Sequence, residues 1–193
     1  MIVRRSGQAP RTAGGLLQCR PVQNGSVVAL VAPASPFTGT EPLGELAPEG
    51  LEAVRPGEAR GPLFGGTLTQ LLASLGTPYE FRPPAGHVLF IDEVGERPYR
   101  LHRMLTQCRL AGLLSLAAAV VFGQLPKCDE PGGRPTARDV VKEIFKDFSG
   151  PVILGFPSGH TSAPFVTLPL GVGTRVIADA HPRLVVEEAA ASE

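Results

Sequence analysis

The chain has 193 residues, 43% of them hydrophobic and 19% charged, which is enough for one ordinary domain with a sizeable core. Its 18 basic and 18 acidic residues cancel, so electrostatics gives no reason to expect a nucleic acid or a membrane as partner. Cys19, Cys108 and Cys128 lie far apart, which favours structural thiols in a reducing compartment over a zinc site. The longest apolar run, residues 113–122, is too short to span a bilayer, and we expect a soluble cytoplasmic protein.

The N-terminal third of the sequence is irregular. Residues 1–25 are polar, Gly-rich and basic without an apolar segment of signal-peptide length, and we expect a flexible leader. Residues 27–32 (VVALVA) form a continuous apolar run that ends at Pro33, as is typical of a strand buried on both faces. Residues 38–61 are rich in Pro, Gly and Glu with little periodicity, and we predict a linker there.

From residue 62 onward, strand patterns alternate with helical patterns. Thr136 and Asp139 have the spacing of a capping box that opens a helix, and another helix begins at Pro98 and ends at Gly112. Alternating strands and helices predict an α/β domain with parallel pairing in its middle. The expected strands cover residues 88–91, 117–122, 152–156, 175–178 and 184–186, and a further short helix covers 68–75.

Two of the expected strands end in side chains that can titrate. Asp92 and Glu93 follow the strand 88–91, and His160 follows the strand 152–156 on a Gly-flanked loop. In open α/β sheets, ligands bind at the carboxyl ends of the strands. A carboxylate that accepts a hydrogen bond from one imidazole nitrogen leaves the other nitrogen free to act as a general base. The sequence therefore suggests an acid–histidine dyad, with two unrelated surface loops as the alternative.

The remaining histidines have weaker contexts. His87 begins a strand, His102 lies on a helix and His181 precedes a proline, and we interpret each as a solvated or capping residue. The histidines and acids lack the spacing of metal ligands, so we expect neither a metal nor an organic cofactor.

Several blocks of the sequence resemble the LD-carboxypeptidase family of serine peptidases. This family includes the muramoyl-tetrapeptide carboxypeptidases and the microcin-immunity peptidases. The resemblance rests on residues 65–79 (GGTLTQLLASLGTPY), 88–112 (VLFIDEVGERPYRLHRMLTQCRLAG) and 155–160 (GFPSGH) with 168–171 (LPLG), which match the second domain in order. Residues 27–36 (VVALVAPASP) are similar to the strand that opens the first, doubly wound domain of the family.

The resemblance implies a role for residues at both strand ends. The family uses a Ser-His-Glu triad, in which the His ends the G-F-x-x-G-H block. The resemblance therefore implies that His160 is the general base. The acid of the triad falls on Asp92, with Glu93 as its neighbour, because the family typically has L-E-D where this chain has Ile91, Asp92 and Glu93. Which of the two acids faces His160 stays open at this stage.

The nucleophile of the family has no counterpart in the sequence. In the family it lies in a G-x-S-D turn of the first domain, and no G-x-S-D occurs in these 193 residues. None of the serines near the matching blocks has a similar context, so we leave the nucleophile unassigned and expect weak or absent hydrolysis by the chain alone. These serines are Ser35, Ser74, Ser115, Ser149, Ser158 and Ser162.

These observations define the expected organisation and function. We expect a leader (1–25), one remnant strand of a doubly wound N-terminal domain (26–37), a linker (38–61) and an α/β LD-carboxypeptidase-like C-terminal domain (62–193). The resemblance implies a serine-type hydrolase that removes the terminal D-alanine from cytoplasmic muropeptides in peptidoglycan recycling. The alternative is a catalytically inactive family member that binds a peptide or a partner. The sequence does not determine the oligomeric state, and a homodimer is one possibility.

Overall fold

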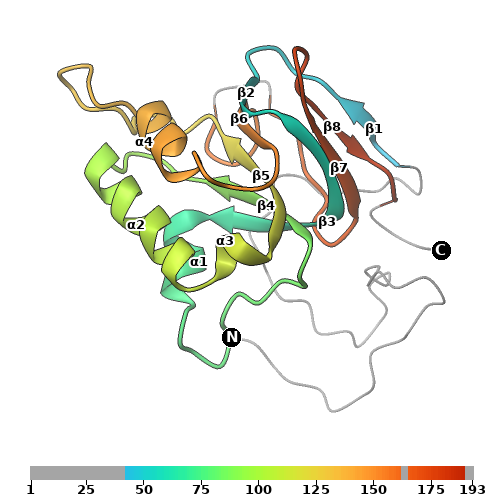
Figure 1. Ribbon diagram of the computed structural model, residues 1–193, viewed down its shortest axis with the longest axis horizontal. Helices are drawn as coiled ribbons and strands as arrows, with labels where there is room; N and C mark the ends of the chain where they lie inside the picture. Colours follow the sequence, from blue (N-terminus) through green and yellow to red (C-terminus); the bar gives the residue numbers. More distant parts are fainter. Residues whose placement is uncertain (1–41, 162–164, 190–193) are drawn as a thin grey trace.

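The computed structural model describes residues 42–161 and 165–189. In these ranges the chain forms one mixed sheet with helices packed against one of its faces (Figure 1). The strands are β1 (Gly44–Leu46), β2 (Glu52–Arg55), β3 (Gly57–Thr67), β4 (His87–Asp92), β5 (Ala117–Gly123), β6 (Val152–Phe156), β7 (Gly173–Ala178) and β8 (Arg183–Val186). The helices are α1 (Leu68–Ala73), α2 (Pro98–Leu110), α3 (Leu113–Leu116) and α4 (Ala137–Ile144).

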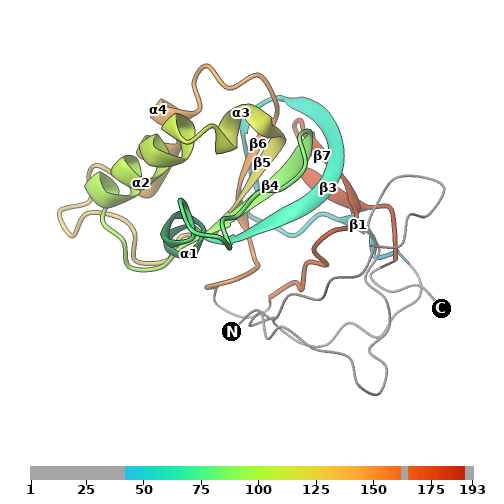
Figure 2. The same ribbon diagram turned by 90° about the horizontal axis from the view of Figure 1, so that it is seen from below.

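The sheet has a parallel centre and antiparallel flanks. Its strand order is β1-β8-β7-β3-β4-β5-β6-β2. The neighbours from β3 to β6 are parallel, which confirms the pairing expected from the alternation of strands and helices. Residues 57–62 of β3 pair with β7 and residues 63–67 pair with β4, and the strand curves strongly between these partners (Figure 2). β3 therefore joins the two parts of the sheet.

The parallel strands are buried on both faces because two hydrophobic cores lie against them. Successive side chains of a strand point to opposite faces. In β4, Leu89 and Ile91 therefore pack beneath the helices, whereas Val88 and Phe90 face the core that the antiparallel strands β7 and β8 complete. This arrangement confirms that the continuous apolar runs of the sequence mark strands covered on both sides.

The helices follow the expected signals at their beginnings. α2 begins at Pro98, and α4 has the expected capping box, in which Thr136 and Asp139 exchange side-chain-to-backbone hydrogen bonds of 3.1 and 3.0 Å. α4 ends at Ile144, but Phe145 continues its apolar face and packs edge-on against Phe122 of β5, with ring centroids 5.3 Å apart. The short helix α3 was not expected, because its residues belong to the same apolar run as β5.

The expected linker over 38–61 is wrong where the structure describes it. β1, β2 and the first residues of β3 fall within this segment and belong to the sheet. β1 and β2 are its two edge strands and are three and four residues long, so they bury too few side chains to produce a recognisable apolar pattern. The expected leader and remnant strand, residues 1–37, lie outside the described residues.

The described cysteines, Cys108 and Cys128, are free and buried. Burial raises the pKa of the Cys108 thiol to about 12, so this thiol stays protonated at neutral pH. Both residues pack in the core beneath the helices, which agrees with the structural role expected for them, while Cys19 lies outside the described residues. Among the described helices, none combines the length and the hydropathy that crossing a bilayer requires.

Candidate functional site

Asp92 and His160 lie in direct contact at the carboxyl edge of the sheet. The Oδ2 atom of Asp92 is 2.6 Å from Nδ1 of the His160 ring, and Oδ1 accepts a hydrogen bond of 3.0 Å from the His160 backbone N–H. The Asp92 side chain is 3% exposed, whereas the His160 side chain is 48% exposed. The contact thus joins a buried carboxylate to an imidazole that solvent can reach.

The parallel pairing of the sheet explains why these residues meet. Asp92 is the last residue of β4, and His160 lies four residues beyond the end of β6, with β5 between the two strands. Because parallel strands end at the same edge, a loop after β6 can fold back over the end of β4. The structure therefore favours the dyad over two unrelated surface loops.

Two glycines make room for the contact. Gly123 ends β5, and a Cβ atom there would lie 3.2 Å from both Asp92 Oδ1 and the Ser158 carbonyl oxygen. Gly159 has a φ of +75°, and its Cβ atom would lie 2.4 Å from Cγ of Asp92. Sequence reasoning assigned no role to either glycine, although both stand at a strand end or in the loop that carries His160.

The hydrogen bonds fix the chemistry available to His160. An ionised carboxylate accepts hydrogen bonds and donates none, so Nδ1 carries the proton in the contact with Asp92. In the neutral ring, Nε2 is then unprotonated and can accept a proton. This tautomer and orientation are those required of a general base that a carboxylate holds in place.

Glu93 lies on the other side of the strand and faces α1. Its Oε2 atom accepts hydrogen bonds from the backbone N–H of Thr69 at 2.9 Å and from the Thr69 hydroxyl at 2.7 Å. Its Oε1 atom accepts from the Val94 backbone N–H at 3.1 Å. The geometry therefore brings Asp92, and not Glu93, to His160, which answers the question that the sequence left open.

Three of the described serines that the sequence singled out have other structural settings. Ser74 and Ser115 donate their hydroxyl protons to backbone carbonyls three residues earlier, those of Leu71 and Gly112, as is common near helix ends. Ser158 is buried in the loop before His160, where its backbone N–H donates to the Phe156 carbonyl. Ser35 and Ser162 lie outside the described residues, and the nucleophile stays unassigned.

The other histidines lie away from this contact. His87 is fully buried, so its interpretation as a solvated or capping residue is wrong, and its Nδ1 donates to the Pro84 carbonyl at 3.0 Å. Burial lowers the pKa of this imidazole, which favours the neutral ring. His181 lies on an exposed turn between β7 and β8. Within the described ranges, no three His, Cys, Asp or Glu side chains are grouped as a metal site would require.

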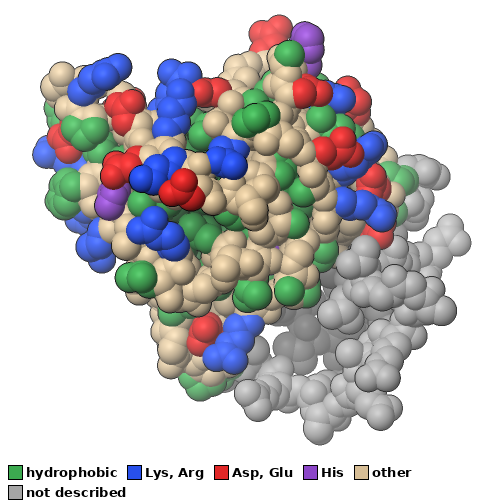
Figure 3. All heavy atoms as spheres, viewed as in Figure 1, with side chains coloured by type: hydrophobic (Ala, Val, Ile, Leu, Met, Phe, Trp, Pro, Cys, Tyr) green, Lys and Arg blue, Asp and Glu red, His purple; other side chains and the backbone are tan. Residues whose placement is uncertain are grey.

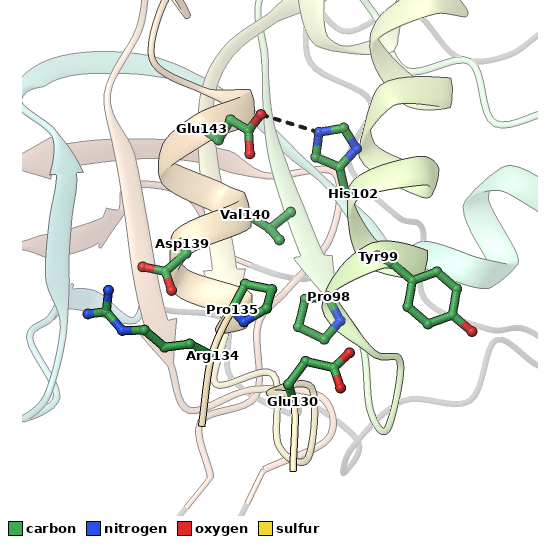
Figure 4. A pocket seen from close by; sticks show the side chains of 9 residues that line it. All are labelled: Pro98, Tyr99, His102, Glu130, Arg134, Pro135, Asp139, Val140 and Glu143. Carbon is green, nitrogen blue, oxygen red and sulfur yellow. Dashed lines mark ion pairs between the residues drawn. The ribbon is translucent and has the colours of Figure 1, made fainter. Parts of the chain in front are cut away.

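His102 lines an open pocket between α2 and α4, with a cavity volume of about 480 Å³ (Figure 4). Its Nε2 atom lies 3.6 Å from Oε1 of Glu143 on the facing helix. On the face drawn in Figure 3, acidic and basic side chains are interspersed. Among the ion pairs of the described residues, Arg138 of α4 pairs with Glu52 of β2. The pocket is lined by Pro98, Tyr99, His102, Glu130, Arg134, Pro135, Asp139, Val140 and Glu143.

Comparison with known protein families identifies the domain. The family model described as the LD-carboxypeptidase C-terminal domain matches residues 60–176. The chain belongs to the LD-carboxypeptidase family. This confirms the resemblance inferred from the sequence blocks, and the match runs from Arg60 in β3 to Val176 in β7 and includes both Asp92 and His160.

Two of the curated carboxypeptidases align with about four fifths and about half of this chain. The "Probable murein peptide carboxypeptidase" of Bacillus subtilis is 34% identical over 164 residues, which cover 81% of this chain and 47% of the relative. The "Murein tetrapeptide carboxypeptidase" of Pseudomonas aeruginosa is 32% identical over 104 residues, or 52% of this chain and 33% of the relative. The chain thus spans about half the length, or less, of the curated relatives it matches.

Solved structures share the fold of this LD-carboxypeptidase domain. An active-site mutant of the microcin C7 self-immunity protein MccF, in the apo state, superimposes with a TM-score of 0.67 at 24% identity, covering 74% of this chain and 42% of that chain. The muramoyltetrapeptide carboxypeptidase of Oxalobacter formigenes superimposes with a TM-score of 0.62 at 27% identity, covering 76% and 50%. The mixed α/β architecture is therefore that of the family's C-terminal domain.

Proposed function

We propose that this chain supplies the acid and the base of a serine-type LD-carboxypeptidase. Its reaction is removal of the terminal D-alanine from cytoplasmic muropeptides during peptidoglycan recycling. The observation that carries the proposal is the contact between the buried Asp92 carboxylate and Nδ1 of the half-exposed His160 ring. Membership of the family supports hydrolase chemistry, and the names of the relatives from Bacillus subtilis and Pseudomonas aeruginosa support a murein peptide as substrate.

In this proposal Asp92 and His160 act as a unit. Asp92 holds the ring through Nδ1 and stabilises the imidazolium that forms when Nε2 takes a proton from the attacking serine hydroxyl. The serine oxygen bonds to the carbonyl carbon before D-alanine, and His160 returns the proton to the nitrogen of D-alanine as that C–N bond breaks. Water then hydrolyses the acyl-serine by the same proton transfers. No metal or organic cofactor takes part in this scheme.

A second candidate is a module that binds a peptide or a partner without cleaving it. The observation in its favour is that the 193 residues contain no G-x-S-D, the motif in which the family carries its nucleophile. Removing the triad nucleophile of a serine protease such as subtilisin, with the other catalytic groups left in place, lowers kcat by a factor on the order of 10⁶. We therefore expect the purified chain by itself to release little or no D-alanine.

The experiment that tests the proposal separates the base from the nucleophile. A hybrid of the Bacillus subtilis relative is made in which the part matched by this chain is replaced by the chain's own residues. D-alanine released from a disaccharide tetrapeptide is measured by mass spectrometry for the hybrid and for the purified chain. We expect release by the hybrid, and a fall of roughly 10⁴-fold in kcat for Asp92→Asn, as for the carboxylate of another serine-protease triad.

Two further variants of the hybrid complete the test. His160→Ala removes the base and should abolish release, whereas His181→Ala removes an exposed histidine and should leave release unchanged. Equal release from a folded His160→Ala hybrid would show that the pair is not the catalytic base. A folded hybrid that releases nothing but binds the tetrapeptide saturably would favour the binding module.

A further inference from the structure

A second buried carboxylate lies directly beside the pair and takes no part in the proposed reaction. The Glu93 residue is 4% exposed, and strand alternation directs its side chain to the face opposite Asp92. Burying an ionised carboxylate is costly unless hydrogen bonds or an opposite charge compensate for the lost water. Among the ion pairs of the described residues, none includes Glu93, so its hydrogen bonds must provide this compensation.

Those hydrogen bonds connect β4 to the start of α1. Glu93 accepts from the Thr69 backbone N–H and from the Thr69 hydroxyl, at 2.9 and 2.7 Å. Thr67, the N-cap residue of this six-residue helix, makes no side-chain capping bond, so the free N–H of Thr69 depends on a residue from another element. In the third bond, the Val94 backbone N–H donates to Oε1 of Glu93 at 3.1 Å, which constrains the backbone directly after β4.

The position of Asp92 is constrained on several sides. Its carboxylate contacts both the ring and the backbone N–H of His160. The space for this carboxylate exists because Gly159 has no side chain, since a Cβ atom on Gly159 would lie 2.4 Å from Cγ of Asp92. The parallel pairing of β3 with β4 also holds the backbone of Asp92, which pairs with Thr67 at the beginning of α1. A contact that fixes the residue after Asp92 to the same helix therefore limits how the strand end can move.

We infer that Glu93 is a positioning residue, which holds the end of β4 against Thr69 of α1 and so keeps Asp92 aligned with His160. The inference rests on the proposed roles of Asp92 and His160 and adds a residue on the opposite face of the strand. Glu93 touches neither the histidine nor the reacting atoms in this arrangement, and it acts through the backbone that it shares with Asp92.

The test reads the tautomer of His160 in the full chain and requires no catalysis. Long-range ¹H–¹⁵N correlation spectra are recorded at mildly alkaline pH, where an unperturbed imidazole is neutral, and His160→Ala assigns the signals. We expect the Nδ1–H tautomer in the wild-type chain. Glu93→Gln removes the charge and Thr69→Val removes the hydroxyl, and each should shift His160 toward a mixture with the Nε2–H form. Thr69→Ser keeps the hydroxyl and should retain the wild-type spectrum.

A matched control separates positioning from general loss of stability. Thr136→Ala removes a capping hydroxyl from α4, a helix that contributes nothing to the pair, and should lower the urea midpoint without changing the His160 spectrum. Thr69 is exposed, so Thr69→Val keeps the test decisive if Glu93→Gln fails to fold. An unchanged His160 tautomer in every folded variant of Glu93 and Thr69 would overturn the inference. A wild-type Nδ1–H tautomer without D-alanine release from the hybrid would instead count against the proposed function alone.

Discussion

The position of Asp92 depends on residues that have no functional group of their own. Gly159 is the residue before His160, and its left-handed φ of +75° lets the loop turn so that the backbone N–H of His160 points at Oδ1 of Asp92. Any larger residue would place its Cβ atom inside the space of the Asp92 carboxylate. The loop sequence P-S-G-H therefore matters for geometry as much as for the histidine that it carries.

The substitution Gly159→Ala should disturb both stability and the pair. An L-residue in the left-handed region costs about 1 kcal/mol, and the overlap with Asp92 adds to this cost. The matched control is Gly76→Ala, because Gly76 has the same φ of +75° but nothing within 4 Å of its Cβ position. Urea unfolding of both variants measures the difference. An equal decrease in the free energy of unfolding in the two variants would mean that the loop can shift to accept the new methyl group and that Gly159 is not tightly packed against Asp92.

The sequence identified His160 and the two adjacent acids but could not choose between Asp92 and Glu93. Alternation along β4 places the two acids on opposite faces, and this much follows from the sequence. Which face the loop after β6 would reach depends on the path of the chain through residues 157–159, and local patterns do not determine that path. The choice of Asp92 therefore came from the folded structure.

At the scale of elements, the sequence predicted best the strands that are covered on both faces. β4, β5 and β6 appear as continuous apolar runs because each lies between the helices and the second core. β1 and β2 lie at the edges of the sheet, and β3 begins with the residues Gly57 and Glu58, which are exposed. Their burial comes from partners distant in sequence, so the segment looked like a linker when considered alone.

Hydrogen exchange provides a direct check of this correction. The backbone amides of residues 57–61 that donate to β7 should be protected to nearly the same degree as those of β5, because their hydrogen bonds form part of the sheet. Core strands open with free energies that approach the global value, about 5–15 kcal/mol for a domain. The amides of Gly132 and Arg134 in the exposed loop 131–135 should exchange rapidly and serve as the reference. Exchange of the amides in 57–61 as fast as in this loop would restore the linker prediction.

At the scale of the whole molecule, the described chain forms two cores on one continuous sheet. The helices cover one face of the parallel strands, and the antiparallel strands β7 and β8 enclose the other. The α/β class and the parallel centre were predictable because they arise from local alternation. The curvature of β3, which brings the antiparallel flank over the second core, depends on pairing between residues more than a hundred positions apart, such as Glu58 and Ile177.

The burial of His87 at the start of β4 makes the stability of the whole molecule depend on pH. Its pKa lies below the ordinary value of 6.5 because burial disfavours the imidazolium. As the pH falls below about 6.5, the unfolded chain binds a proton at this residue that the folded chain does not, so the free energy of unfolding should decrease. The slope is at most about 1.4 kcal/mol per pH unit, and the loss ends once the pH is below the pKa of the folded state.

The variant His87→Asn isolates this contribution. Asparagine keeps a donor for the Pro84 carbonyl but cannot be protonated, so the decrease below pH 6.5 should become shallower although the variant is less stable overall. His181→Gln removes an exposed histidine and should leave the slope unchanged. Urea unfolding at a series of pH values measures both slopes. If His87→Asn has the same slope as the wild type, the buried imidazole does not govern the acid sensitivity of the fold. A shallower slope would mean that this sensitivity arises at the amino end of β4, at the opposite end of the strand from Asp92.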